Sequence, residues 1–178
     1  MEVFWRQGYE ATSINDLTAA MGINPPSLYA AFGDKERLFL EAVDRYLCGP
    51  GDAAKALEGA PTARAAVERL LTEAAAELTR PDHPPGCMVV TSAMNCSAGS
   101  AHLHAALSER RAASEARIKA AIDRGLKRRE LPAGTNAAAL AKFYMTVLEG
   151  MTIQARDGAT REQLLAVAES ALCAWPWR

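Results

Sequence analysis

Two nucleophilic side chains and two histidines lie close together in the middle of the chain. Cys87 and Ser92 could act as nucleophiles, and His102 or His104 could act as their base. Nucleophilic catalysis also needs an acid that orients the base and a loop that stabilises the oxyanion. No acidic residue at motif spacing and no glycine-rich loop supplies them. We therefore predict that the protein is not an enzyme and has no catalytic residues.

Metal ligation and cysteine pairing are also poorly supported. The chain has four cysteines: Cys48, Cys87, Cys96 and Cys173. They form no C-x-x-C pair and have no histidine at zinc-ligand spacing. The two histidines at 102 and 104 would be separated by about 200° on a helix, which argues against a shared metal. We expect no metal, no cofactor and no disulfide, and we expect reduced, mostly buried thiols.

The composition indicates a soluble, helical protein. Of the 178 residues, 49% are apolar and 37 are alanine, whereas only 6% are aromatic, a bias that favours helix over sheet. The net charge of −1 excludes a polycation that binds nucleic acid by bulk charge alone. No apolar run approaches the ~18 residues of a membrane span, and the N-terminus is no signal peptide. We therefore expect a cytoplasmic protein without a membrane partner.

Glycine and proline clusters divide the chain into segments with a helical apolar period. A break at 48–51 separates short elements from longer ones, which extend over about 62–78, 101–129, 136–156 and 161–174. Thr62, Thr135 or Asn136, and Thr160 are the expected N-caps of three of these segments. An alternating strand pattern occurs only at 87–91 and is too short to pair. The sequence predicts an all-α fold with domains at residues 1–47 and 51–178.

Residues 12–34 have the strongest local pattern. The hydroxyl pair at 12–13 can cap a first helix, which would end at Gly22 in the left-handed conformation. Asn24 can cap a second helix that has the prolines 25–26 in its first turn, where a missing N–H costs little. Two short helices joined by a glycine-containing turn are typical of a helix-turn-helix, although many other αα-corners share this spacing.

The residues themselves are more specific than the spacing. The chain has aromatic-x-x-x-Gly-Tyr-x-x-Thr-Ser at 4–13, Gly-Ile at 22–23, Leu-Tyr-x-x-Phe at 28–32 and Lys-Glu-x-Leu at 35–38. This region resembles the DNA-binding region of the TetR/AcrR transcriptional regulators over about residues 4–47. The resemblance implies an N-terminal three-helix helix-turn-helix domain, followed by a larger C-terminal helical domain for ligand binding and dimerisation.

The resemblance also assigns roles to single residues. The positions expected at the DNA are Thr12, Ser13, Asn24, Pro25, Pro26, Ser27, Tyr29 and Lys35. Thr12, Ser13 and Lys35 would contact phosphates, whereas Ser27 and Tyr29 would touch the backbone or base edges. Tyr29 could also lie at the rim of the core. The small core expected beneath them consists of Leu17, Ile23, Leu28 and Phe32, with Met1 and Phe4 facing it from the first helix.

Two departures from the family pattern affect DNA binding. The prolines at 25–26 stand where many relatives have a residue that reaches a base, so we expect few base contacts and a reliance on DNA shape. The first helix, about residues 1–7, is shorter than the family's, and residues 1–47 carry three more acidic than basic side chains. This acidic excess fits a missing basic N-terminal stretch.

The C-terminal part is expected to hold the ligand and the dimer contact. The helices at about 136–156 and 161–174 would form a four-helix bundle across a two-fold axis, with Trp175 either at that contact or inside its own subunit. Basic residues crowded at 117–129 form a solvated face or an anion-binding patch. The candidate ligand-binding residues, which also fit an ordinary core, are Cys87, Met88, Met94, His102, Phe143, Tyr144, Met151 and Gln154.

The sequence therefore predicts a TetR-like homodimer that binds double-stranded, palindromic operator DNA. We expect a repressor, and an unknown small molecule that releases it. The alternative is a ligand-binding and dimerisation module that has lost DNA binding through its shortened first helix.

Overall fold

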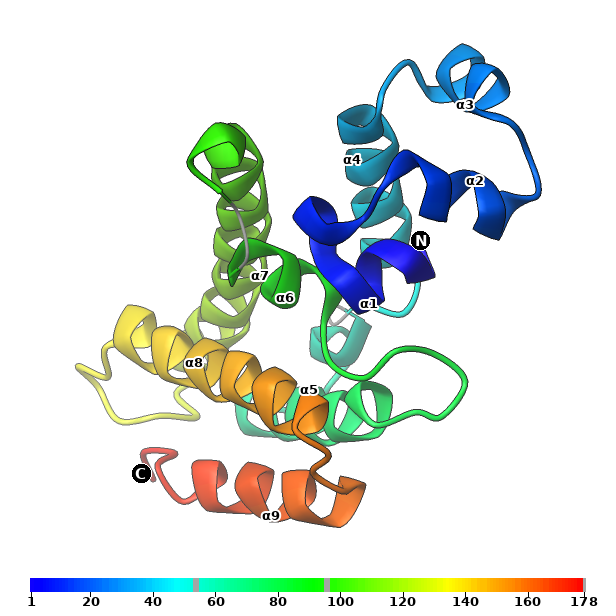
Figure 1. The fold of residues 1–178 in the computed structure, drawn as a ribbon. Helices are drawn as coiled ribbons and strands as arrows, with labels where there is room; N and C mark the ends of the chain where they lie inside the picture. Colours follow the sequence, from blue (N-terminus) through cyan, green and yellow to red (C-terminus); the bar gives the residue numbers. More distant parts are fainter. Residues whose placement is uncertain (53–54, 95–96, 178) are drawn as a thin grey trace.

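The computed structural model describes residues 1–52, 55–94 and 97–177, and all regular elements within them are helical (Figure 1). The N-terminal helices are α1 (Glu2–Ala11), α2 (Ile14–Met21), α3 (Pro25–Phe32) and α4 (Lys35–Leu47). The larger part contains α5 (Ala63–Leu78), α6 (Met88–Met94), α7 (Ala101–Lys127), α8 (Ala137–Arg156) and α9 (Arg161–Leu172), with short 3-10 turns η1 (Lys55–Leu57) and η2 (Ala98–Ser100). The predicted all-α fold is confirmed.

The first helix changes direction inside its span. At Gly8 the backbone has φ 77°, a left-handed value that breaks the helical path. An L side chain there would be strained, which explains a glycine inside a helix. α1 packs against α6, and both Phe4 before the kink and Tyr9 after it lie with ring centroids 5.2 Å from that of Phe39 on α4. α1 therefore contacts both parts of the molecule.

Side-chain caps fix the starts of α5, α8 and α9, as predicted. Thr62 Oγ1 accepts a hydrogen bond from the N–H of Ala65 at 3.1 Å, and Asn136 Oδ1 accepts one from the N–H of Ala139 at 3.0 Å. Thr160 starts α9 with a reciprocal capping box that involves Gln163. The segment 87–91, whose short alternating pattern is too short to pair, enters α6. Its apolar residues are buried between α1 and α7 and make helical bonds such as Thr91 N–H to Cys87 O at 3.0 Å.

Two hydrophobic cores organise the described helices. One joins α5, the C-terminal half of α7, α8 and α9, and includes Leu71, Ile122, Tyr144 and Trp175. The second joins α1–α4 with α6 and the N-terminal half of α7. Its members are Phe4, Trp5, Leu17, Leu28, Leu38, Phe39, Ala42, Val43, Tyr46, Met88, Val89, Ala93, Leu103 and Leu107. The second core thus continues across the domain boundary predicted after residue 47.

Several burial predictions are wrong. Ile23 is 37% exposed, because the turn between α2 and α3 leaves it at the surface, and Met1 is also exposed. The thiols of Cys48 and Cys173 are exposed, since both residues lie just beyond helix ends, and Cys87 is half-buried. Cys96 lies outside the described residues.

The two tryptophans near the end of the chain differ in their surroundings. Trp175 packs inside its own chain, with its ring centroid 6.0 Å from that of Tyr144. Trp177 is 67% exposed. Within residues 1–52, 55–94 and 97–177, no helix combines the length and apolar character needed to cross a bilayer.

Candidate DNA-binding interface

The start of α2 is held by a reciprocal pair of side chains. Ser13 Oγ accepts a hydrogen bond from the N–H of Asp16 at 3.1 Å. The Asp16 carboxylate accepts from the backbone N–H of Ser13 at 2.8 Å and from its hydroxyl at 2.7 Å, and these bonds lower the pKa of Asp16. The predicted capping arrangement is confirmed, with Ser13 exposed at the positive end of α2.

The turn between α2 and α3 has the predicted geometry. Gly22 adopts φ 66°, and the N–H of Ile23 donates to the carbonyl of Thr18 at 3.1 Å, which closes the end of α2. Asn24 Oδ1 then accepts from the N–H of Ser27 at 2.9 Å and starts α3. The end of α2 and the start of α3 are both fixed by hydrogen bonds within the turn. The residues of the turn therefore determine the angle between the two helices.

α3 lies at the outer end of the N-terminal part, far from α5, α8 and α9 (Figure 1). Leu28 is fully buried beneath it, and Phe32 is half-buried. The exposed residues are Pro25, Pro26, Ser27, Tyr29, Ala30 and Ala31. Tyr29 is 48% exposed, so it lies at the surface and not in the core. α3 therefore presents the predicted residues 25–27 and 29 on one accessible surface.

Thr12 and Lys35 are bonded to neighbouring parts of the N-terminal helices. Thr12 is buried and its hydroxyl donates to the carbonyl of Gly8 at 2.6 Å. The Lys35 ammonium donates to the carbonyl of Thr12 at 2.8 Å and lies 4.2 Å from the centre of the Tyr9 ring. The Thr12 hydroxyl is therefore directed inward, whereas Lys35 is half-buried at the edge of the surface.

Three polar contacts tie the N-terminal helices to α7 and the segment before it. Glu10 Oε1 accepts hydrogen bonds from the backbone N–H and the hydroxyl of Ser97, at 3.1 and 2.7 Å. Hydrogen bonds from the hydroxyls of Ser100 and Ser97 lower the pKa of Glu10 to about 2. On α4, the Glu36 carboxylate lies 2.7 Å from His102, and further along the helix Asp44 lies 2.6 Å from Arg110.

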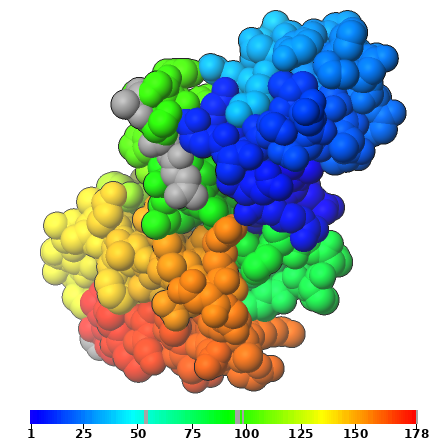
Figure 2. Space-filling model, viewed as in Figure 1, coloured from blue at the N-terminus to red at the C-terminus, as the bar shows by residue number. Residues whose placement is uncertain are grey.

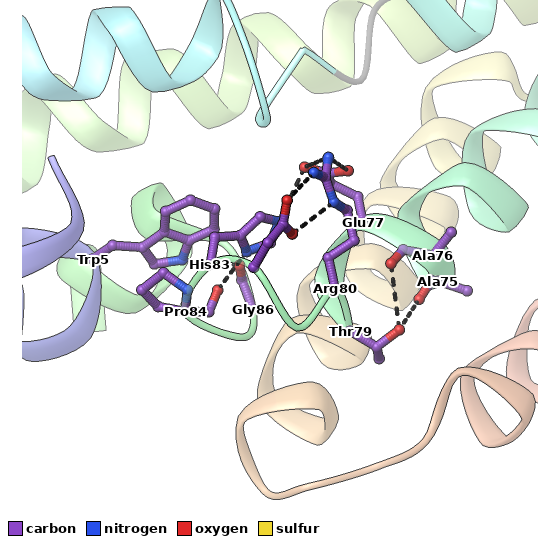
Figure 3. Close-up of polar contacts among 10 residues, drawn as sticks. Trp5, Ala75, Ala76, Glu77, Thr79, Arg80, His83, Pro84 and Gly86 are labelled. Carbon is purple, nitrogen blue, oxygen red and sulfur yellow. Dashed lines mark hydrogen bonds and ion pairs between the residues drawn. The ribbon is translucent and has the colours of Figure 1, made fainter.

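A second junction joins α1 to the loop between α5 and α6 (Figure 3). The Trp5 indole N–H donates to the carbonyl of Gly86 at 3.0 Å, and its ring stacks on His83 with centroids 4.4 Å apart. His83 is held in turn by Glu77 Oε1 and the carbonyl of Pro84, which lie 3.1 and 2.9 Å from its two ring nitrogens. The contacts bury Trp5 between the two parts of the chain.

Sequence reasoning missed these junctions. Arg156 at the end of α8 donates to the carbonyls of Trp5 and Arg6, at 3.4 and 3.3 Å, across about 150 positions of sequence. The other contacts join residues 66 to 87 positions apart. A single sequence does not show which residues form such pairs. Each charged side chain taken alone suggests only a solvated surface residue, and each aromatic side chain suggests only an ordinary core residue.

The predicted ligand residues lie in several different surroundings. Met88 and Cys87 are at the second core, where burial and hydrogen bonding with Cys87 raise the pKa of Tyr46 far above its usual value. Tyr144 and Met151 are buried in the first core, and burial raises the pKa of Tyr144 to about 12. The remaining predicted residues are exposed: Met94, His102, Phe143 and Gln154.

Two grooves lie on the larger part. One, of about 600 Å³, runs between α6, α7 and α8 and includes Met94 and His104. Arg111 and Glu149 form an ion pair at 3.4 Å in this groove. The other, of about 480 Å³, lies between α8 and α9 and is lined mainly by apolar side chains, among them Phe143 and Val167.

Three of the six basic residues at 117–129 bond to groups on or beside the end of α7. Lys119 pairs with Asp123 at 2.7 Å, and the guanidinium groups of Arg124 and Arg128 donate to the carbonyls of Leu57 and Pro61 at 3.4 Å. This arrangement fits a solvated face at the end of α7.

Comparison with known proteins agrees with this geometry. The family model described as "Bacterial regulatory proteins, tetR family" matches residues 1–42, and the model described as "Tetracyclin repressor-like, C-terminal domain" matches residues 63–170. The chain is 34% identical over 180 residues to the HTH-type transcriptional repressor ComR of Escherichia coli (strain K12), covering 99% of this chain and 85% of ComR. It is 32% identical to the repressor BdcR of the same organism, covering 95% and 81% of the two chains.

A solved structure extends the likeness to the whole fold. A cysteine mutant of the TetR family regulator CifR, complexed with 26-bp double-strand operator DNA, is 46% identical with a TM-score of 0.95. The match covers 98% of this chain and 92% of that chain. Together with the exposed α3 and the capped turn before it, these likenesses identify the site: the chain belongs to the TetR family and is a DNA-binding transcriptional regulator, not an enzyme.

Proposed function

We propose that the protein is a homodimeric repressor that binds palindromic operator DNA in the cytoplasm and is released from it by a small molecule. The contact between the N-terminal helices and α6–α7 carries this proposal. Phe39, Val43 and Tyr46 of α4 pack in one core with Met88 of α6 and Leu103 of α7. A ligand that shifts α6 or α7 must therefore also shift α4, because a close-packed core does not deform continuously.

The proposal that the N-terminal helices contact DNA is supported by the exposure of α3 and by the start of α2 at Ser13. In a helix-turn-helix the second helix enters the major groove, and two such helices must lie about 34–36 Å apart to reach successive grooves. Ser13 at the N-terminus of α2, with Lys35 beside it, suits the phosphate contacts that set the register. The CifR complex with operator DNA supports the same use of this end of the chain.

The dimer contact is proposed at α8 and α9. Phe143 and Val167 are large apolar side chains that remain exposed beside the α8–α9 groove. An exposed apolar surface of this kind is costly for a single subunit, and a two-fold axis through it would bury the same patch on both copies. Four helices would then form a bundle.

The effector site is proposed in the groove between α6, α7 and α8. Its volume of about 600 Å³ lies within the range of small-molecule sites. Val90, Met94 and Ile153 supply apolar walls, and the pair Arg111–Glu149 supplies polar atoms that would orient a ligand. Because α6 also belongs to the second core, occupation of this groove and binding of the operator would be reciprocally coupled.

The proposal can be tested on the full chain. A random duplex library selected on the protein supplies the operator, and fluorescence anisotropy then measures its affinity at several salt concentrations. We expect nanomolar binding of a palindrome by a dimer, with strong salt dependence. Salt-insensitive binding, or binding by a monomer, would contradict the proposal.

Release is tested with a panel of small molecules screened against the protein–operator complex. A compound that releases the wild-type protein should fail on Thr146→Trp, which fills the proposed groove. The nearly isosteric Thr146→Val is the matched control and should still respond. Loss of response in both variants, or in neither, would remove this groove as the effector site.

A further inference from the structure

The part of α3 that lies opposite the core is apolar. Leu28 and Phe32 mark the side of α3 that faces the core. At about 100° per residue, Pro26 and Ala30 lie close to the opposite side of the helix. Both residues are exposed, so this pair forms the ridge that reaches furthest from the core.

The residues beside this ridge have few polar side chains that could reach a base. Residues 25–32 contain no charged, asparagine or glutamine side chain, and their polar side chains are Ser27 and Tyr29. The Asn24 carbonyl oxygen is already engaged by the N–H of Ser27. The bidentate contacts that select guanine or adenine in the major groove come from Arg, Lys, Asn or Gln. α3 has none of these residues.

One base has an apolar group in the major groove. Thymine carries a C5-methyl group there, and apolar side chains such as alanine recognise it by contact. A ridge of proline and alanine carbons is complementary to such methyl groups and has no partner for the polar edges of the other bases. The exposed face of α3 therefore matches thymine.

We propose that Pro26 and Ala30 select the operator by contacting thymine methyl groups in the major groove of each half-site. The inference rests on the proposed function, in which α3 enters that groove. Side chains at i and i+4 are about 5–6 Å apart, and successive base pairs about 3.4 Å apart. The two residues thus reach thymines separated by one or two base steps.

The DNA itself provides the sharpest test. The operator selected on the full chain is resynthesised with deoxyuridine in place of thymidine at one position at a time. Deoxyuridine pairs like thymidine but lacks the methyl group. Burial of a methyl group contributes about fourfold in affinity, so we expect one or two positions in each half-site to lose about fourfold each. Substitution at all of them should cost a dimer about 16-fold if one position in each half-site responds and about 250-fold if two respond. Substitution outside the half-sites should cost nothing.

Protein variants assign each methyl group to a residue. In Ala30→Gly, the deoxyuridine substitution opposite residue 30 should have no further effect, because the contact is already lost. Ala113→Gly, at an exposed alanine within α7, is the matched control for the helix-weakening effect of glycine and should keep the full response to deoxyuridine. Pro26→Ala should reduce the response at the second position.

The outcomes separate this inference from the proposed function. Tight, selective binding that is equal for thymidine and deoxyuridine operators overturns methyl recognition and leaves operator binding intact, with DNA shape as the source of selectivity. A response to deoxyuridine that persists unchanged in Ala30→Gly and Pro26→Ala also overturns it. If selection enriches no duplex above non-specific binding, the proposed function fails, and this inference with it.

Discussion

Replacing Trp5 by phenylalanine should destabilise the protein through the junction between α1 and the loop before α6. The substitution removes the indole N–H, which donates to the buried carbonyl of Gly86 at 3.0 Å. A buried acceptor left without its partner costs about 1–3 kcal/mol. The smaller ring also weakens the stacking on His83 at 4.4 Å and the edge contact with Tyr46 at 4.7 Å, which are worth about 0.5–1.5 kcal/mol each. We expect a total loss of about 2–4 kcal/mol.

Urea unfolding followed by circular dichroism measures this loss. The midpoint should fall and the slope should stay constant, because the surface exposed on unfolding hardly changes. Protein concentration must be the same in all samples, since the measured stability of the proposed dimer would depend on it.

The matched control is Trp177→Phe, because Trp177 is largely exposed and lies beside Arg64 at the surface. This substitution should change the free energy of unfolding by less than about 0.5 kcal/mol. A loss below about 1 kcal/mol for Trp5→Phe, or equal losses for the two variants, would refute the reasoning that this junction stabilises the fold.

Three further substitutions test local parts of the site. The pKa of Glu10 is lowered to about 2 from 4.5, so its contribution to stability is complete above about pH 4.5 and is lost as the pH falls from there toward 2. The difference in urea midpoint between wild type and Glu10→Gln should therefore shrink over this range, and a difference that grows toward low pH would contradict the assignment. Ser13→Ala removes the cap of α2 and should cost about 1 kcal/mol in thermal unfolding, whereas Ser13→Asp should cost much less. Gly22→Ala places an L side chain at φ 66° and should cost about 1–2 kcal/mol, and Gly22→Asn should cost less because asparagine tolerates this conformation.

Local structure was predictable wherever a few adjacent residues decide it. Asn24 and Thr160 cap helices because their own side chains reach the next turn, and Gly22 ends α2 because only a few residues accept its conformation. In each case the residues that decide the start or end of the helix lie within about four positions of one another. The two short helices and the turn between them could therefore be predicted from 12–34, whereas their assignment as a helix-turn-helix relied on the resemblance over 4–47.

Burial and long-range contacts were harder to predict. Ile23 is apolar, yet the turn places it at the surface, since the small core beneath α3 is already filled by Leu28 and Phe39. The segment 87–91 has a short apolar pattern that is compatible with a strand or a helix. In the structure it is buried between α1 and α7 and is helical. The outcome for 87–91 depends in part on α1, about 80 positions away in the sequence, and periodicity does not identify such a partner.

The candidate site shows the same division. Residues 25–27 and 29 are all exposed on α3, the helix that the resemblance to the TetR/AcrR regulators places at the DNA. Whether they and the predicted ligand residues bind as expected stays a prediction. For the ligand residues, helical spacing could not distinguish the buried Tyr144 from the exposed Phe143 beside it, because the packing of α9 on α8 decides which of them is covered.

The shared core has a practical consequence for protein engineering. Phe39 and Tyr46 of α4 share one hydrophobic core with Met88 of α6 and Leu103 of α7, so the N-terminal helices alone do not complete this core. A chimera that transplants residues 1–47 onto another regulator would leave these aromatic rings against a foreign surface, and its folding yield should suffer. A transplant that also carries the faces of α6 and α7 beneath them would move the complete folding unit, so α6 and α7 belong in any graft that aims to exchange operator specificity.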